Sequence, residues 1–151
     1  MILGIVGAEE KSWLIPAKIK AKEYILNFIL EVNPEIITSG HCPYGGVDLW
    51  AEAYAYLLNI PTKIFPAEVN QWIDKDGLKG YKSRNEEIAR ASDILLVISP
   101  MIDSKVIKNG GEWTGDYAST LVGKTITRAR FTNIGTVKIE TTITDDIYKY
   151  N

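Results

Sequence analysis

Residues 35–59, EIITSGHCPYGGVDLWAEAYAYLLN, decide the fold that we expect for this chain. The run Ile-Ile-Thr at 36–38 is short, apolar and β-branched, which is typical of a buried strand. The loop at 39–46 holds three glycines, so its backbone can turn sharply and approach a ligand closely. From Val47 onward the apolar residues recur with helical spacing. A strand, a glycine loop and a helix N-terminus predict an anion site, because free N–H groups and the positive end of the helix dipole face the loop.

The spacing of the glycines excludes two common phosphate-binding motifs. No Lys-Ser or Lys-Thr pair follows the last glycine, as a Walker A loop requires, and Gly40-x4-Gly45-Gly46 differs from the dinucleotide pattern G-x-G-x-x-G. The loop by itself leaves two interpretations open: a phosphate or nucleotide site, or a strand–helix turn that needs glycine for its backbone.

The composition predicts a single globular domain. Of its 151 residues, 46% are hydrophobic and 24% are charged, as in soluble globular proteins. This length is enough for one domain with a full hydrophobic core but is short for two domains. The net charge of −2 argues against a nucleic-acid-binding protein, which usually carries a basic excess. No apolar run is long enough to span a membrane, no signal peptide is expected, and the single Cys42 cannot form an internal disulfide. We therefore expect a cytoplasmic protein with no membrane partner.

Strands and helices alternate along the chain. Strands are expected at residues 2–6, 36–38, 62–65 and 94–98, and helices at about 16–32, from 47 onward, 83–91 and 112–121. Ser83 and Glu86 have the spacing of a capping box for the third helix, and the polar segment 67–82 is interpreted as a functional loop or lid. The alternation predicts an α/β fold with a mostly parallel sheet and helices on both faces.

The C-terminal segment differs from the rest. Residues 125–143 are rich in Thr, Ile and Val and predict two strands joined by a turn at 133–135. We expect one strand to extend the parallel sheet and the other to add antiparallel at its edge.

Three blocks of the sequence carry a family resemblance. The first is TSGHCPYGGVD at 38–48, followed by Ala-Glu at 51–52. The second is Phe-Pro-Ala at 65–67, with Trp at 72, Gly at 80 and Ser-Arg-Asn at 83–85. The third is DILLV at 93–97 with GGEWT at 110–114, a degraded G-G-x-G-T motif. Together they resemble the SLOG superfamily, the LOG, DprA and YspA-like Rossmannoid proteins, and most closely its YspA-like branch.

The resemblance covers residues 1 to about 124 and implies a Rossmann-like three-layer sandwich with a sheet of order about 3-2-1-4-5. The chain would form one domain, with a core at 1–124 and a β-rich extension at 125–151. A nucleotide or ribose-phosphate pocket is implied at the C-terminal edge of the sheet, where open parallel sheets bind ligands. No cofactor is expected. The expected ligand-binding residues are Gly7, Ser39, Gly40, Gly45, Gly46, Asp48, Arg84, Asn85, Gly110, Gly111 and Thr114.

Four side chains at this edge have competing interpretations. Arg84 offers a planar fork to a phosphate, or is a solvated arginine at a helix start. Asn85 bonds a ribose hydroxyl or caps the helix. Asp48 is expected to tie the glycine loop by accepting N–H bonds rather than to bind ribose. Trp72 stacks on a base or anchors the loop.

Catalytic residues cannot be carried over from the family. Its enzymes share G-G-x-G-T-x-x-E, and here Trp113 and Tyr117 stand at the positions of the glycine and the glutamate. Glu112 and Asp116 are the nearest catalytic candidates, although both are out of register. Glu9, after the first strand, is interpreted as a polar loop residue rather than a ligand contact. No metal site is expected, because His41-Cys42 alone supplies too few ligands for zinc.

The function expected from these observations is binding of a nucleotide or ribose phosphate, as a sensor or accessory protein. Two alternatives stay open: an N-glycosidase or phosphoribohydrolase acting on nucleoside monophosphates, and single-stranded DNA binding as in DprA, which the net charge disfavours. We also expect a homo-oligomer, most simply a dimer. A lone two-stranded ribbon is marginal in water, exposed edges invite pairing, and family members are often dimers.

Overall fold

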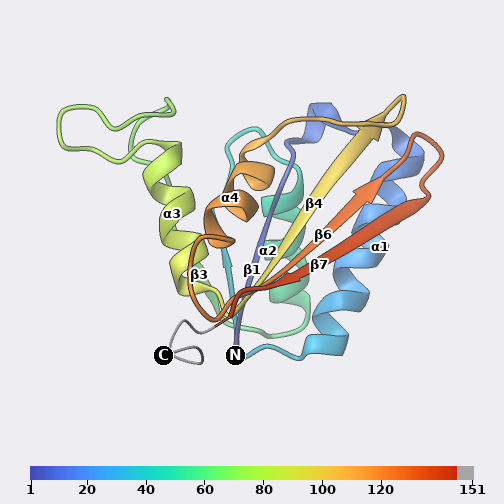
Figure 1. The fold of residues 1–151 in the computed structure, drawn as a ribbon, viewed down its shortest axis with the longest axis horizontal. Coiled ribbons are helices and arrows are strands. Elements are labelled where there is room, and N and C mark those ends of the chain that lie inside the picture. The colour runs from blue at the N-terminus through green and yellow to red at the C-terminus, as the bar shows by residue number, and fades with distance from the viewer. Residues whose placement is uncertain (146–151) are drawn as a thin grey trace.

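One sheet with helices on both faces forms the fold (Figure 1). The structure is a computed structural model that describes residues 1–145. Its strands are β1 (Ile2–Gly7), β2 (Ile36–Ser39), β3 (Thr62–Ile64), β4 (Ile94–Ile102), β5 (Lys105–Val106), β6 (Thr125–Phe131) and β7 (Val137–Ile143). Its helices are α1 (Ile15–Val32), α2 (Val47–Leu57), α3 (Tyr81–Ala91), α4 (Gly110–Ala118) and the short 3-10 helix η1 (Glu10–Ser12). No helix within residues 1–145 is long and apolar enough to cross a membrane.

The strand order is β3-β2-β1-β4-β6-β7. The strands from β3 to β6 are parallel, β7 adds antiparallel to β6, and β5 pairs antiparallel with the end of β4. The α/β, Rossmann-like sandwich is confirmed. The order differs from 3-2-1-4-5 only because the short β5 takes the fifth place in the chain, so that β6 is the expected fifth parallel strand.

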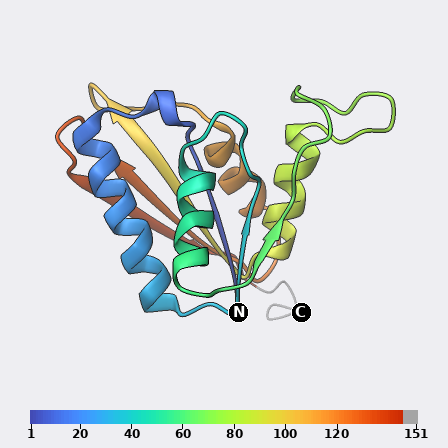
Figure 2. The ribbon, with the colours of Figure 1, turned by 180° about the vertical axis from the view of Figure 1, so that it is seen from behind.

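Two apolar layers flank the sheet. One core packs α1 and α2 against the face that carries Leu3, Ile5 and Ile37, and Figure 2 shows these two helices in front of the sheet. The other packs α3 and α4 against the face that carries Val6 and Val97. Because β1 and β4 are covered on both faces, their sequences are continuous apolar runs rather than alternating ones.

Several predicted boundaries are wrong. β4 does not end at residues 99–100 but continues to Ile102, and it tolerates Pro100 because β1 has already ended opposite Ile98. α3 begins at Tyr81, with Gly80 as its N-cap, and Ser83 donates its hydroxyl to Asp74 (2.6 Å) instead of capping the helix.

Helix α4 also departs from its predicted bounds. It begins two residues earlier than predicted, at Gly110, and ends three residues earlier, at Ala118. Its start is set by Asn109, whose side-chain oxygen accepts the N–H of Glu112 at 3.1 Å. The earlier start brings both glycines of the third motif into the first turn of the helix.

The C-terminal strands confirm the expected pair. β6 extends the parallel sheet beside β4, and β7 returns along it after a turn in which Thr132 donates its N–H to Thr136 (2.9 Å). Phe131 of β6 is fully buried beneath α1, so this pair belongs to the main core rather than to a separate ribbon. Residues 146–151 of the expected extension lie outside the described residues.

Candidate functional site

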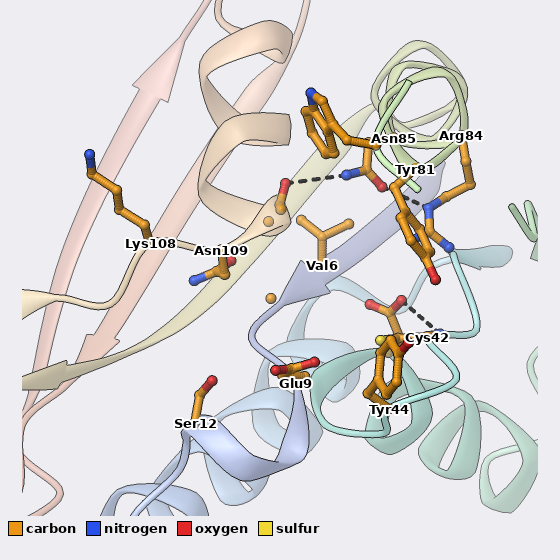
Figure 3. A pocket seen from close by; sticks show the side chains of 15 residues that line it. Val6, Glu9, Ser12, Cys42, Tyr44, Tyr81, Arg84, Asn85, Lys108 and Asn109 are labelled. Carbon is orange, nitrogen blue, oxygen red and sulfur yellow. Dashed lines mark hydrogen bonds between the residues drawn. The ribbon is translucent and has the colours of Figure 1, made fainter. Parts of the chain in front are cut away.

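A cavity of about 300 Å³ opens at the C-terminal edge of the sheet, between the ends of β1 and β4 (Figure 3). The crossover that leaves β1 runs to α1 on one face, whereas the segment after β4 runs to α4 on the other. Ligands of open parallel sheets bind at such a switch point. The cavity therefore lies where the fold itself favours a ligand.

The structure brings six of the eleven predicted ligand-binding residues to the wall of this cavity. They are Gly7, Asp48, Arg84, Asn85, Gly110 and Gly111. The other five, which do not line it, are Ser39, Gly40, Gly45, Gly46 and Thr114. Of these, Ser39 and Thr114 are fully buried, and their hydroxyls donate to the backbone carbonyls of Asp48 (3.4 Å) and Gly110 (2.6 Å).

The glycine loop is packed against protein rather than open to a ligand. The first N–H of α2, at Val47, donates to the carbonyl of Ala8 (3.2 Å), and Glu10 donates its N–H to Tyr44 (3.4 Å). Gly46 has φ +85°, and a Cβ there would lie 2.3 Å from the Ala8 carbonyl oxygen. The two last glycines of the loop therefore serve the turn and its contact with residues 8–10, as the second interpretation of the loop requires.

Arg84 is a buried cation without a carboxylate in contact. Its side chain is 6% exposed, its Nε donates to Oδ1 of Asn85 at 2.7 Å, and one Nη donates to the carbonyl of Gly40. The guanidinium also lies over the ring of Tyr81, 5.1 Å from its centroid. No described residue forms an ion pair with it. A charge held mainly by neutral partners in a cavity wall leaves its attraction available to an anionic ligand.

Asn85 connects Arg84 to the N-terminus of α4. Its Oδ1 accepts from Arg84, and its Nδ2 donates to the carbonyl of Gly110 at 3.4 Å (Figure 3). Gly111 follows, and a Cβ there would lie 2.7 Å from the Cα of Gly7, so only glycine lets α4 approach the end of β1 this closely. The positive end of α4 and the guanidinium thus flank one side of the cavity.

Asp48 faces the cavity from the first turn of α2. Its Oδ2 accepts the backbone N–H of Cys42 at 3.1 Å, which agrees with the predicted role of tying the loop. Burial raises the pKa of Asp48 to about 6, and this effect outweighs the lowering by Arg84. Burial likewise raises the pKa of the Cys42 thiol, so Cys42 is not an activated thiolate.

Sequence reasoning missed several side chains of the wall. Glu9, interpreted above as a plain loop residue, lines the cavity together with Ser12, Tyr44 and Lys108 (Figure 3). Tyr81 also lines it, and its spacing to Arg84 places both on one face of α3, a signal that the sequence contains. Glu9 and Lys108 carry no such signal, because loops bring them here.

The two catalytic candidates lie outside the wall and are held in ion pairs. Oε1 of Glu112 accepts from Arg128 (3.1 Å) and Arg130 (2.6 Å), and its Oε2 accepts from Ser99 (2.8 Å). Asp116 accepts from Arg128 at 2.8 Å and is otherwise exposed. These contacts fasten α4 to β6, so both carboxylates have structural roles.

Aromatic residues form the outer rim beside α4. Trp72, from the long loop before α3, lines the cavity and meets the ring of Trp113 edge-on, with centroids 5.0 Å apart. Trp113 in turn stacks on Tyr117 at 5.6 Å. Trp113, supported by Tyr117, therefore holds Trp72 of the loop in place, and anchoring the loop is one of the two roles considered for Trp72.

The comparisons with known proteins add no relative. No family model matches the chain, and no curated protein or solved structure matches it. The interpretation of the cavity depends on its own geometry and on the motifs quoted above.

Proposed function

We propose that this protein binds a nucleotide or ribose phosphate in the cavity between β1 and β4. The observation that carries the proposal is Arg84, a buried guanidinium without a carboxylate in contact, joined through Asn85 to the N-terminus of α4. A phosphate beside Gly110 and Gly111 would meet the positive end of the helix dipole, the N–H groups of these two glycines and the positive charge of Arg84. All of these groups carry positive charge toward the cavity, so they attract an anionic ligand and repel a cationic one.

The remaining wall suits the rest of such a ligand. Asp48 and Glu9 offer acceptors for ribose hydroxyls, and Trp72 and Tyr44 offer aromatic faces for a base. A volume of about 300 Å³ is at the small end for ligand pockets. It therefore favours a mononucleotide or a sugar phosphate over a dinucleotide.

A sensor or accessory role fits this site better than hydrolysis by the family's glutamate. That glutamate is replaced by Tyr117, and the neighbouring carboxylates Glu112 and Asp116 are ion-paired to β6. Single-stranded DNA binding gains no support from a cavity of this size.

Asp48 supports one second candidate, an N-glycosidase. Such an enzyme needs a carboxyl group that activates water or stabilises an oxocarbenium-like centre. Asp48 lines the cavity and has a pKa raised to about 6, near the range in which a carboxyl group exchanges protons at neutral pH. It takes the place of Glu112 and Asp116 as the residue to test.

Calorimetric titration tests the binding function. We expect AMP and ribose 5-phosphate to bind and adenosine to bind at least about tenfold more weakly, because it lacks the phosphate. Equal affinity for AMP and adenosine would contradict the anion site, and so would the absence of binding by any phosphate compound.

Base release from nucleoside monophosphates, followed by chromatography, separates the two candidates. We expect little or none. Robust release that Asp48→Asn abolishes, while AMP binding persists, would establish the enzyme in place of the sensor.

A further inference from the structure

The outer strand β7 leaves apolar side chains exposed at the edge of the sheet. It pairs with β6 on one side, and no strand within residues 1–145 pairs with its other side. On the side of the sheet that carries α1, β7 presents Val137, Ile139 and Ile143, whose side chains are 36%, 54% and 70% exposed. The partners of Val137 and Ile139 across the ladder on β6, Phe131 and Ala129, are fully buried under α1. Helix α1 thus covers β6 but leaves much of the outer strand β7 exposed.

The backbone of β7 turns a defined set of hydrogen-bonding groups outward. Thr144 donates its N–H to Lys124 (2.8 Å) and accepts from Gly123 (3.2 Å), and Thr136 accepts from Thr132 (2.9 Å). Because antiparallel pairing alternates along a strand, the even-numbered residues of β7 face β6. The N–H and C=O groups of the odd-numbered residues 137, 139, 141 and 143 point away from it.

The charges of β7 select one register for pairing with itself. Lys138 and Glu140 project on the face opposite the apolar residues and flank Ile139. A two-fold axis at Ile139 sets Lys138 of each strand against Glu140 of the other, twice. An axis at Lys138 or at Glu140 would instead set like charges against each other, which is unfavourable. The hydrogen-bonding pattern agrees, since Ile139 is one of the outward-facing residues and can exchange both bonds with its symmetry mate.

We propose that β7 is the homodimer interface, pairing antiparallel with β7 of a second copy about a two-fold axis at Ile139. The two sheets then join into one. Ile139 meets its own copy, Val137 meets Thr141, and the exposed apolar face of each β7 is extended by the other. Such an isologous contact closes on itself and removes an edge that would otherwise invite uncontrolled pairing. This interface is independent of the ligand cavity at the ends of β1 and β4.

A charge exchange tests the register. Light scattering coupled to gel filtration of the full chain should give twice the monomer mass at micromolar protein. Lys138→Glu sets four carboxylates together and should weaken dimerisation about tenfold or more. The Lys138→Glu monomer should still fold, because position 138 lies directly across the ladder from Arg130 and a glutamate there would complement the charge of Arg130. The double variant Lys138→Glu/Glu140→Lys restores opposite charges and should regain the dimer.

A disulfide tests the axis independently of stability. In a Cys42→Ala background, Ile139→Cys should crosslink under mild oxidation, because directly opposed residues of a hydrogen-bonded pair have Cα atoms about 5.5 Å apart. Val137→Cys is the matched control, since it faces Thr141 and should stay uncrosslinked. A monomeric mass overturns the proposal. So does a dimer that Lys138→Glu leaves intact, or one that crosslinks equally well through both cysteines.

Discussion

Replacing Arg84 by alanine is the most direct test of the ligand site. The guanidinium is buried, and two of its nitrogens donate to neutral oxygens, of Asn85 and Gly40. The alanine variant removes the cation that would face a bound phosphate. A hydrogen bond to a charged group is worth about 1.5–3 kcal/mol, so AMP should bind about 10- to 150-fold more weakly.

The same change also affects folding, and the assay must separate the two effects. Loss of the buried bond leaves the Gly40 carbonyl without its partner, which costs about 1–3 kcal/mol of the free energy of unfolding. Titration calorimetry should therefore be run well below the melting temperature, with urea denaturation in parallel. Arg84→Lys is the control: it keeps the charge but loses the fork, and should fall between wild type and Arg84→Ala in affinity. Unchanged affinity in the folded alanine variant would refute the reasoning.

Three further predictions concern stability. Burial raises the pKa of Asp48 from its ordinary value of 3.8 to about 6, so between these values the folded protein binds more protons than the unfolded chain, and the free energy of unfolding falls as the pH rises. Asp48→Asn should remove this fall. Urea melts should show the difference in the free energy of unfolding between wild type and variant growing to about 3 kcal/mol by pH 7 and then levelling. Glu112→Gln should cost about 3 kcal/mol in urea melts, because it breaks a largely buried ion-pair network with two arginines of β6. Asp116→Asn, at an exposed position, should cost at most about 1 kcal/mol, and equal costs would contradict a structural role for the Glu112 network. Gly46→Ala should lower the free energy of unfolding by about 3 kcal/mol or more, because Gly46 has a positive φ and a Cβ there would clash with residue 8. Gly77→Ala, which has a positive φ but open space around it, should lower it by only about 1–2 kcal/mol, and a thermal melt that ranks the two variants the other way refutes the packing role.

The secondary structure was predictable because its signals are local. The continuous apolar runs of β1 and β4 and the helical periodicity of α2 identified these elements with correct types. The errors lie at boundaries. Ser83 has the spacing of a helix cap, but its hydroxyl donates to Asp74 in the preceding loop, and no sequence pattern within α3 indicates that contact.

The candidate site was only half predictable. Arg84, Asn85 and Gly110 were selected from motifs, and they do meet at one cavity. Gly46 was selected for the same reason, but it serves a contact with residues 8–10 instead. A glycine needed for a ligand and a glycine needed for close packing have the same sequence signature, and only the fold distinguishes them.

The sequence by itself determined the α/β class, the parallel sheet with its C-terminal strand pair, and the sheet edge at which the cavity opens. Each follows from residue spacing and from general rules of strand connection, which act over a few neighbours along the chain. The tertiary structure decided what each polar group at that edge is free to do. Arg84 reaches across 44 residues to Gly40 and is left without a carboxylate in contact, whereas Glu112 reaches 16 residues to Arg128 and is neutralised. Such pairings depend on which loops and strands the fold brings together, because Coulomb attraction and desolvation act through space and not along the sequence.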